Sequence, residues 1–226
     1  MKHAGKAQKA ALKIILVTLA PALVLLVVSC FSKGLVLTGL ASTLMILWVL
    51  FTVFTLNFFR DPEARPPEGK GLVLSPAHGT VDVVDDTSED QFMGGPCKRI
   101  SIFLNVFDVH VQKAPVTGKV VFQKHTDGQY LSATKSDCGS FNENVLIGIV
   151  PEDSPRKKIA IRLIAGLIAR RIIVWATEGE TITRGERISL VQFGSRGDVY
   201  LPRDAKIQCK LGDKVIGGET ILAVLE

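Results

Sequence analysis

The sequence predicts a mainly β fold, a compact barrel or sandwich, preceded by an N-terminal pair of membrane-spanning helices. Three features of the 226-residue chain lead to this prediction. Two long uncharged segments lie near the N-terminus, short segments rich in β-branched residues follow residue 71, and a glycine-containing pattern occurs twice near the C-terminus. The first feature is typical of membrane helices, and the other two are typical of antiparallel strands joined by tight turns.

Two uncharged segments at the N-terminus are long enough to cross a bilayer. Residues 14–31 contain no charged side chain, and neither do residues 35–59. A helix needs about 20 apolar residues to span the hydrocarbon core. We therefore predict transmembrane helices at residues 14–31 and 35–57, joined by Ser32-Lys33-Gly34, in an anchor of residues 1–59. A cleaved signal peptide is the alternative for the first segment, but the second segment would still anchor the chain.

The flanking charges predict the orientation of this anchor. Four lysines and no acidic residue lie in the first 13 residues, and Arg60, Arg65 and Lys70 follow the second segment. Only Lys33 lies between the two segments. Because positively charged flanks stay in the cytoplasm, both ends of the hairpin should be cytoplasmic. The rest of the chain should then lie on the cytoplasmic face of the cell membrane.

Composition excludes several other classes of protein. Outside the first 13 residues the chain carries 23 basic and 22 acidic residues, so the basic surface of a nucleic-acid-binding domain is not expected. The four cysteines and four histidines are scattered, without the spacing of a metal site or of a disulfide scaffold. We therefore expect no nucleic-acid partner and no metal.

A linker and a β domain follow the anchor. Prolines and glycines predict a linker at residues 60–71, and residues 72–226 then form one domain. A helix of one or two turns is predicted at Ala165–Arg171. β-branched and aromatic residues, punctuated by Gly, Pro or Asp, predict short strands. These strands are Leu72–Leu74, Thr80–Val84, Ile100–Val111, Lys119–Gln123, Ile159–Ile164, Ile172–Thr177, Ile188–Phe193 and Asp198–Leu201.

A pattern with two glycines recurs at an offset of 33 residues. Residues 179–188 and 212–221 both read Gly-[Asp/Glu]-x-[Ile/Val]-x-x-Gly-Glu-x-Ile, and glycine permits the positive φ that tight turns require. The pattern resembles the turn-then-strand unit of biotinyl- and lipoyl-type barrel-sandwich domains. Ser75-Pro-Ala-His-Gly-Thr-Val81 resembles the opening strand of such a barrel-sandwich hybrid. A common hairpin turn is the alternative explanation.

The peptide bond between Gly194 and Ser195 is a candidate site of self-cleavage. Glycine allows backbone conformations that bring a serine hydroxyl close to the preceding carbonyl carbon. Attack would convert the amide into an ester if a nearby base takes the hydroxyl proton. Elimination and hydrolysis would then leave a pyruvoyl group on the new chain. A Gly-Ser pair alone is weak support, because one such pair is expected by chance and Gly139-Ser140 is a second.

Five motifs in order along the chain strengthen this hypothesis. They are Asn57-Phe-Phe-Arg-Asp-Pro-Glu63, Ser75-Pro-Ala-x-Gly79, Phe107-Asp-Val-His-Val-Gln-Lys-Ala-Pro115, Ile164-Ala-Gly-Leu-Ile-Ala-Arg-Arg-Ile172 and Val191-Gln-Phe-Gly-Ser-Arg-x-Asp-Val-Tyr-Leu-Pro202. Together they resemble the short, membrane-anchored (archaeal) type of phosphatidylserine decarboxylase proenzyme, a pyruvoyl-dependent family. The resemblance extends from residue 57 to the C-terminus.

The resemblance implies that the chain cuts itself between Gly194 and Ser195. A β chain of residues 1–194 and an α chain of residues 195–226 would stay associated, with Ser195 converted into the pyruvoyl prosthetic group. This group would be the electron sink for loss of CO₂ from phosphatidylserine, giving phosphatidylethanolamine. The expected partners are membrane phosphatidylserine and the other chain of the cut protein. The resemblance implies no soluble cofactor and no metal, and a homo-oligomer is left open.

The same motifs supply further candidate catalytic residues. The resemblance makes His110 the base for cleavage and an acid for the decarboxylated carbon, and the ordinary histidine pKa of about 6.5 suits both roles. Asp108 would share a face with His110 in an extended strand, where it either orients the imidazole or is a solvated acid. His78 stands where the family has aspartate, and neutral imidazole cannot supply that anion. Asp82, Asp108 or His78 itself would have to replace it.

Three arginines are candidates for binding the lipid. Guanidinium groups bind phosphate well, so Arg162, Arg170 and Arg171 would hold the headgroup or the anionic membrane surface. Ordinary exposed charge is the alternative.

Two other functions are alternatives to the decarboxylase. A swinging-arm carrier would need a lysine beside a methionine in its central hairpin, which neither repeat has. A relative that lost self-cleavage through His78 would be an uncleaved, membrane-tethered lipid-binding or scaffold barrel. Self-cleavage at Ser195 separates the decarboxylase from both alternatives.

Overall fold

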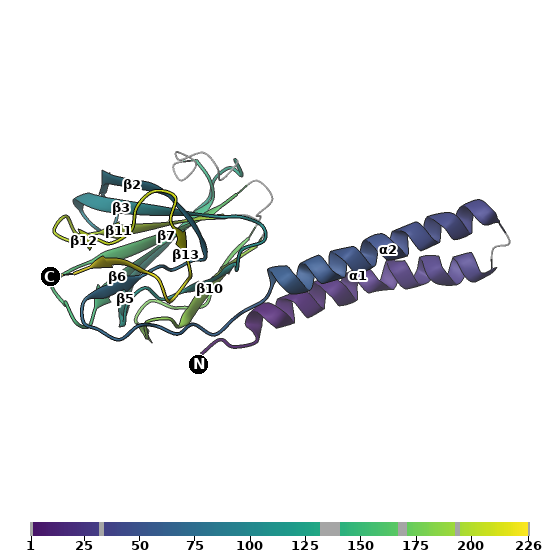
Figure 1. Cartoon of the computed structure of the whole chain (residues 1–226), viewed down its shortest axis with the longest axis horizontal. Helices are drawn as coiled ribbons and strands as arrows, with labels where there is room; N and C mark the ends of the chain where they lie inside the picture. Colours follow the sequence, from purple (N-terminus) through teal and green to yellow (C-terminus); the bar gives the residue numbers. More distant parts are fainter. Residues whose placement is uncertain (1, 32–33, 132–140, 167–170, 193–194, 226) are drawn as a thin grey trace. The chain divides into compact units, whose positions relative to one another are not determined.

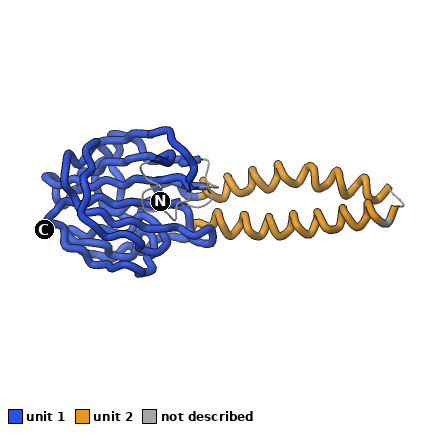
Figure 2. Tube along the Cα trace, turned by 90° about the horizontal axis from the view of Figure 1, so that it is seen from above, with its two compact units in different colours: residues 1–4, 62–226 blue, residues 5–61 orange. Residues whose placement is uncertain are grey.

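The computed structural model divides the chain into two compact units. One unit is residues 5–61, and the other is residues 62–226 together with residues 1–4 (Figure 2). The residues described are 2–31, 34–131, 141–166, 171–192 and 195–225.

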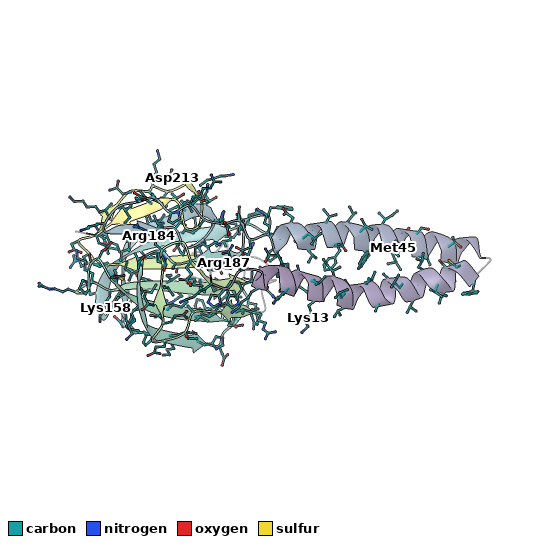
Figure 3. All side chains as sticks on the ribbon, turned by 90° about the horizontal axis from the view of Figure 1, so that it is seen from below. Lys13, Met45, Lys158, Arg184, Arg187 and Asp213 are labelled. Carbon is teal, nitrogen blue, oxygen red and sulfur yellow. The ribbon has the colours of Figure 1, made fainter. Side chains whose placement is uncertain are left out.

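The unit of residues 5–61 is a pair of long apolar helices, α1 (Lys6–Phe31) and α2 (Leu35–Phe58). Both are long and apolar enough to span a membrane, and their side chains project outward along the pair (Figure 3). The Trp48 indole nitrogen of α2 donates a hydrogen bond to the Thr18 hydroxyl of α1 at 3.1 Å. Each predicted segment lies within a helix, with α1 beginning at Lys6 rather than at residue 14.

The other unit is mainly β, as the sequence predicts, and its strands curl into a half-barrel (Figure 1). Within the described residues the strands are β1 (Leu72–Leu74), β2 (Gly79–Glu89), β3 (Gly95–Leu104), β4 (Val111–Lys113), β5 (Gly118–Thr126), β6 (Asn144–Pro151), β7 (Ile159–Ala165), β8 (Ile172–Val174), β9 (Thr181–Ile182), β10 (Arg187–Val191), β11 (Ser195–Leu201), β12 (Lys206–Ile207), β13 (Lys214–Val215) and β14 (Ile221–Val224).

Strand β11 lies in the middle of the largest sheet. The strand order there is β13-β2-β3-β11-β7-β6-β5-β9, and two smaller sheets have the orders β1-β14-β12 and β4-β10-β8. Side chains alternate along a strand, so that neighbouring residues face opposite sides of the sheet. On β11, Val199 and Leu201 face the main apolar core, together with alternate residues of β3 and β7. Ser195 has the same parity and therefore shares this face.

Several predicted elements have different boundaries in the structure. The predicted strand Ile100–Val111 is wrong in its second half, because β3 ends at Leu104 and a turn precedes β4. The sequence missed β6, in which no polar residue alternates with the apolar ones after Asn144. The predicted helix at Ala165–Arg171 is wrong at its first residue, since Ala165 ends β7, and residues 167–170 lie outside the described part of the chain.

The glycine repeat predicted from the sequence is present as two equivalent turns. Gly179 and Gly212 have φ of 88° and 89°, and Gly185 and Gly218 have φ of 78° and 79°. In each copy the amide of the second glycine donates a hydrogen bond to a carbonyl oxygen of an earlier segment. Gly185 donates to Ala114, and Gly218 donates to Ser75. The repeat is thus longer than the sequence pattern indicated, because each copy includes one of these earlier segments.

The earlier segments of the two copies are Ser75-Pro-Ala-His-Gly79 and Ala114-Pro-Val-Thr-Gly118. Each ends in a glycine that opens a long strand, β2 or β5. A Cβ atom at Gly118 would overlap the carbonyl oxygen of Val150 in the paired strand β6. Close approach of two backbones therefore requires glycine at this position.

We predict that Gly118→Ala destabilises the β domain, because the added methyl group pushes β5 away from β6. The expected loss is about 1–3 kcal/mol in the free energy of unfolding. The measurement is the thermal unfolding midpoint of the full chain in detergent. Gly197→Ala is the matched control, since its Cβ would lie 3.9 Å from the nearest atom, Cβ of Ala77. Equal midpoints for the two variants would contradict the close approach.

Candidate active site

Ser195 begins β11 at the centre of the sheet, and its side chain is buried. Its backbone pairs with Leu104 of β3 on one side and with Ala165 of β7 on the other. The residue is 1% exposed. Within the described part of the chain, its hydroxyl has no hydrogen-bond partner, which is unusual for a buried polar group and is found at reactive sites. Gly194, the other half of the predicted cleavage site, lies outside the described residues.

The segment of residues 105–110 brings His110 to the same region as Ser195. It leaves β3 at Leu104, which pairs with Ser195. At its other end, the carbonyl of His110 accepts a hydrogen bond at 3.3 Å from the amide of Val191, the last residue of β10. Val191 and Ser195 are the two ends of the short connection between β10 and β11. The side chain of His110 is fully buried. The backbone of His110 is thus hydrogen-bonded to the residue at which this connection begins.

Asp108 contacts His110 through its backbone and not through its carboxylate. The Asp108 carbonyl oxygen lies 2.9 Å from Nδ1 of His110, and this hydrogen bond requires the proton of the imidazole to be on Nδ1. The Asp108 carboxylate accepts a hydrogen bond from the amide of Asn105 at 2.8 Å, which closes the turn. Asp108 and His110 therefore do not share the face of one extended strand. Nε2 of His110 carries the basic lone pair.

His78 contacts the second glycine turn. Its Nδ1 accepts a hydrogen bond from the amide of Gly217 at 3.3 Å, so its proton lies on Nε2. The equivalent residue of the other repeat is Thr117, whose hydroxyl accepts a hydrogen bond from the amide of Arg184 at 3.1 Å. The His78 side chain therefore fills a position that a hydroxyl fills in the other repeat. Sequence reasoning missed this equivalence, although Pro-x-x-Gly in both segments was a readable signal.

Asp82 pairs with Arg196, the residue after Ser195. The Asp82 carboxylate accepts a hydrogen bond from Nη1 of Arg196 at 2.9 Å and a second one from Nη2. The register of β2 shifts between Val81 and Val83, so the regular alternation of side chains is interrupted at Asp82. Partial burial raises the pKa of Asp82, and the Arg196 guanidinium opposes that rise.

The face of the sheet opposite to Ser195 carries a row of buried polar residues. Asp198 of β11 is paired with Ser101 of β3 and with Arg162 of β7, and it is 2% exposed. The Tyr200 hydroxyl donates a hydrogen bond to the Asp198 carboxylate at 3.4 Å. Burial raises the pKa of Asp198 and that of Tyr200. The sequence placed Asp198 in a motif but gave no sign that the residue is buried.

Of the three candidate lipid-binding arginines, two are described. Arg162 Nη2 lies 3.3 Å from the carboxylate of the buried Glu89, and its guanidinium carbon lies 5.1 Å from the centre of the Tyr200 ring. Arg171 is exposed, and its carbonyl accepts a hydrogen bond from the amide of Gln192 at 3.2 Å. Arg171 therefore lies beside the end of β10, whereas Arg162 lies on the opposite face of the sheet from Ser195. Arg170 is outside the described residues.

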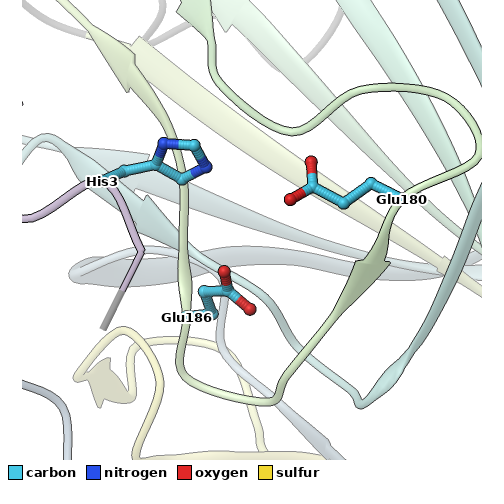
Figure 4. A group of neighbouring side chains, drawn as sticks. All are labelled: His3, Glu180 and Glu186. Atoms are coloured by element: carbon cyan, nitrogen blue, oxygen red, sulfur yellow. The ribbon is translucent and has the colours of Figure 1, made fainter.

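One group among the described residues has the side-chain types of a metal site. His3, Glu180 and Glu186 place their ligand atoms within 4.8 Å of one another (Figure 4). The ammonium group of Lys2 lies 2.8 Å from the Glu180 carboxylate and 3.8 Å from that of Glu186. Because this ammonium already forms ion pairs with both carboxylates, we assign no metal to the group.

Comparison with known proteins agrees with the motifs at this site. The model of the phosphatidylserine decarboxylase family matches residues 51–223. A phosphatidylserine decarboxylase proenzyme of Desulfotalea psychrophila is 46% identical over 195 residues, which are 85% of this chain and 90% of that protein. Proenzymes of the same name from Symbiobacterium thermophilum and Pelobacter propionicus are 39% and 45% identical, over 86% and 79% of this chain and 85% and 80% of their own lengths. The chain therefore belongs to the phosphatidylserine decarboxylase family, and it is an enzyme of the carboxy-lyase class.

Proposed function

We propose that this chain cuts itself between Gly194 and Ser195, and that the pyruvoyl group so formed on Ser195 serves to decarboxylate phosphatidylserine to phosphatidylethanolamine. The observation that carries the proposal is the buried Ser195 hydroxyl, which has no hydrogen-bond partner in the described part of the chain. It stands at the Gly-Ser bond of a chain that belongs to a family of proenzymes.

The proposed cleavage uses the atoms of Ser195 itself. Its Oγ adds to the carbonyl carbon of Gly194 while a base takes the hydroxyl proton, and the amide nitrogen leaves as an amine. The product is an ester that links the two chains. Removal of the Cα proton of Ser195 then expels the Gly194 carboxylate and leaves dehydroalanine. Water hydrolyses this group, releasing ammonia and leaving the ketone of a pyruvoyl group.

Burial of Ser195 fits this conversion. A side chain that is 1% exposed is shielded from bulk water, so the ester is protected from simple hydrolysis before elimination takes place. When formed, the pyruvoyl group would supply an electron-withdrawing ketone for the loss of CO₂. The residues of the chain itself have to bind the lipid, keep water out and move protons.

His110 is the proposed base for cleavage and the proposed acid that protonates the decarboxylated carbon. The proton on Nδ1 is held by the carbonyl of Asp108, which leaves the Nε2 lone pair as the basic site. Asp108 is thus proposed to orient the imidazole through its backbone, while its carboxylate holds the turn. His78 presents the opposite tautomer and is proposed to act as a donor from Nε2.

The lipid is proposed to approach from the cytoplasmic face of the cell membrane. The positive residues on both flanks of the α1–α2 hairpin support this orientation. Arg170 and Arg171, next to the end of β10, are proposed to bind the headgroup phosphate or the anionic surface. The same role for Arg162 would require its guanidinium to leave Glu89.

The position of β11 supports continued association of the two chains after the cut. As the first strand of the α chain, it would be hydrogen-bonded to β3 and β7 of the β chain on both sides. Extraction of the α chain would therefore break the largest sheet. A homo-oligomer is compatible with this arrangement but is not needed for it.

We predict that Ser195→Ala abolishes processing, because the nucleophile is lost. A denaturing gel with intact-mass analysis should show two fragments for the wild type, the smaller one starting at residue 195 with a blocked N-terminus. The variant should show one full-length species. Ser101→Ala is the matched control, a buried serine on the other face of the neighbouring strand, and it should still be cut.

Two outcomes would count against the proposal. Cleavage of Ser195→Ala at the same bond would assign the cut to an external protease. A wild type that stays uncut on long incubation and releases no CO₂ from phosphatidylserine vesicles would favour the uncleaved lipid-binding or scaffold barrel instead.

We predict that His110→Ala slows processing by about 10²–10⁴-fold, the usual contribution of a general base. The rate of fragment formation measures this effect, and added imidazole should restore part of it by occupying the vacated space. His125→Ala is the control, because His125 is an exposed histidine of β5 bound to Glu143. Normal processing of His110→Ala would exclude His110 as the base.

We predict that His78→Asp is processed at least as fast as the wild type. Aspartate can accept the Gly217 amide hydrogen bond and also supplies a negative charge that favours a protonated base. His78→Thr, which introduces the residue type of Thr117 in the other repeat, should fold but be processed more slowly, since it has neither the Nε2 donor of histidine nor the negative charge of aspartate. The rate of fragment formation measures both effects. If His78→Asp folds and is not cut, the imidazole ring itself is required.

A further inference from the structure

The second residue after the proposed cut is a buried arginine that is held by the carboxylate of Asp82. Arg196 is 1% exposed, and arginine cannot lose its charge in a protein. Its guanidinium forms a bidentate ion pair with the Asp82 carboxylate, in which Nη1 donates to Oδ1 at 2.9 Å and Nη2 donates to Oδ2. Removing a carboxylate that pairs with a buried charge is strongly unfavourable. The position of Arg196 is therefore restrained by Asp82.

The ion pair joins β11 to β2, two strands of the sheet that are separated by β3. Arg196 lies on β11 and is paired in register with Phe103 of β3, which is in turn paired with Thr80 of β2. Asp82 belongs to β2, at the irregularity between Val81 and Val83. A bulge of this kind re-aims a side chain out of the regular alternation. Asp82 thereby reaches across β3 and ties the start of β11 to β2.

The geometry separates this restraint from the site of reaction. Ser195 and Arg196 are neighbours on β11, so their side chains point to opposite faces of the sheet. The ion pair can hold the strand without occupying space beside the Ser195 hydroxyl. After the cut, the backbone link to Gly194 is gone. The ladder to β3 and β7 and the Asp82–Arg196 pair then hold the new chain end.

We propose that Asp82 and Arg196 are positioning residues, which hold Ser195 in place for the cut and hold the resulting pyruvoyl group in place for decarboxylation. This inference rests on the proposed function. It gives Asp82 a structural and electrostatic role at the start of β11, with no proton transfer. Neither residue touches the reacting atoms.

A matched ion pair on the same sheet provides the control. Arg99 of β3 donates to Asp85 of β2 through Nε at 3.0 Å and through Nη2 at 2.6 Å. The two side chains are 21% and 40% exposed, and the pair joins strands that are already adjacent. Asp85→Asn thus removes a two-pronged Arg–Asp pair from β2 without affecting the start of β11.

The experiment compares full-length wild type with Asp82→Asn, Asp82→Glu, Arg196→Lys and Asp85→Asn in detergent. Time courses of fragment formation give the cleavage rate, and CO₂ release from phosphatidylserine vesicles by fully cut protein gives kcat and KM. We expect Asp82→Asn to slow cleavage by roughly ten- to a hundredfold, as a displacement of about 1 Å would. Asp82→Glu should recover part of this loss, and Asp85→Asn should behave like the wild type.

The split between kinetic constants separates positioning from a general loss of stability. Cut Asp82→Asn and Arg196→Lys should show a lower kcat with KM unchanged, at temperatures well below their unfolding midpoints. Equal cleavage rates for Asp82→Asn and wild type would overturn the inference, and so would equal slowing by Asp82→Asn and Asp85→Asn. If Asp82→Asn does not fold, Asp82→Glu and Arg196→Lys decide by the same criteria. A wild type that is never cut would instead overturn the proposed function.

Discussion

The antiparallel pairing of β11 with strands on both sides is the constraint on which the rest of the structure depends. Ser195 is the first residue of this strand, and its neighbours across the sheet are Leu104 and Ala165. The ladder restrains the backbone from Ser195 onward. The strand thus presents a serine held at its first residue by pairing on both sides. It also sends reactive and charged side chains to opposite faces.

Backbone groups, rather than carboxylate side chains, determine the tautomers of His78 and His110. The Asp108 carbonyl fixes the proton of His110 on Nδ1, and the Gly217 amide fixes that of His78 on Nε2. The nearby carboxylates accept hydrogen bonds from other groups: that of Asp108 from the Asn105 amide, and that of Asp82 from the Arg196 guanidinium. With these tautomers, Nε2 is the unprotonated nitrogen of a neutral His110 and the protonated nitrogen of a neutral His78.

The sequence was sufficient for the fold class and for the order of the motifs, because apolar periodicity, turn glycines and motif spacing are local signals. The sequence was insufficient where pairing between distant segments determines the local structure. The register shift at Asp82 and the turn before His110 have no local signal in the sequence, so the prediction that Asp108 and His110 share a strand face was wrong. Strand β6 was missed because a strand buried on both faces does not alternate. The burial of Arg196 and Asp198 follows from their position in the central strand, which no local pattern shows.

The two glycine turns with their leading segments have a consequence for the history of the fold. Matching φ values, matching amide contacts and matching Pro-x-x-Gly openings are the arrangement expected of a duplicated unit. One copy carries His78 and leads into the strand that holds Asp82, whereas the other has Thr117 and opens β5. An ancestral half-length hairpin would thus have needed only stability. The present backbone unit accommodates either an imidazole or a hydroxyl at this position while keeping the same turn.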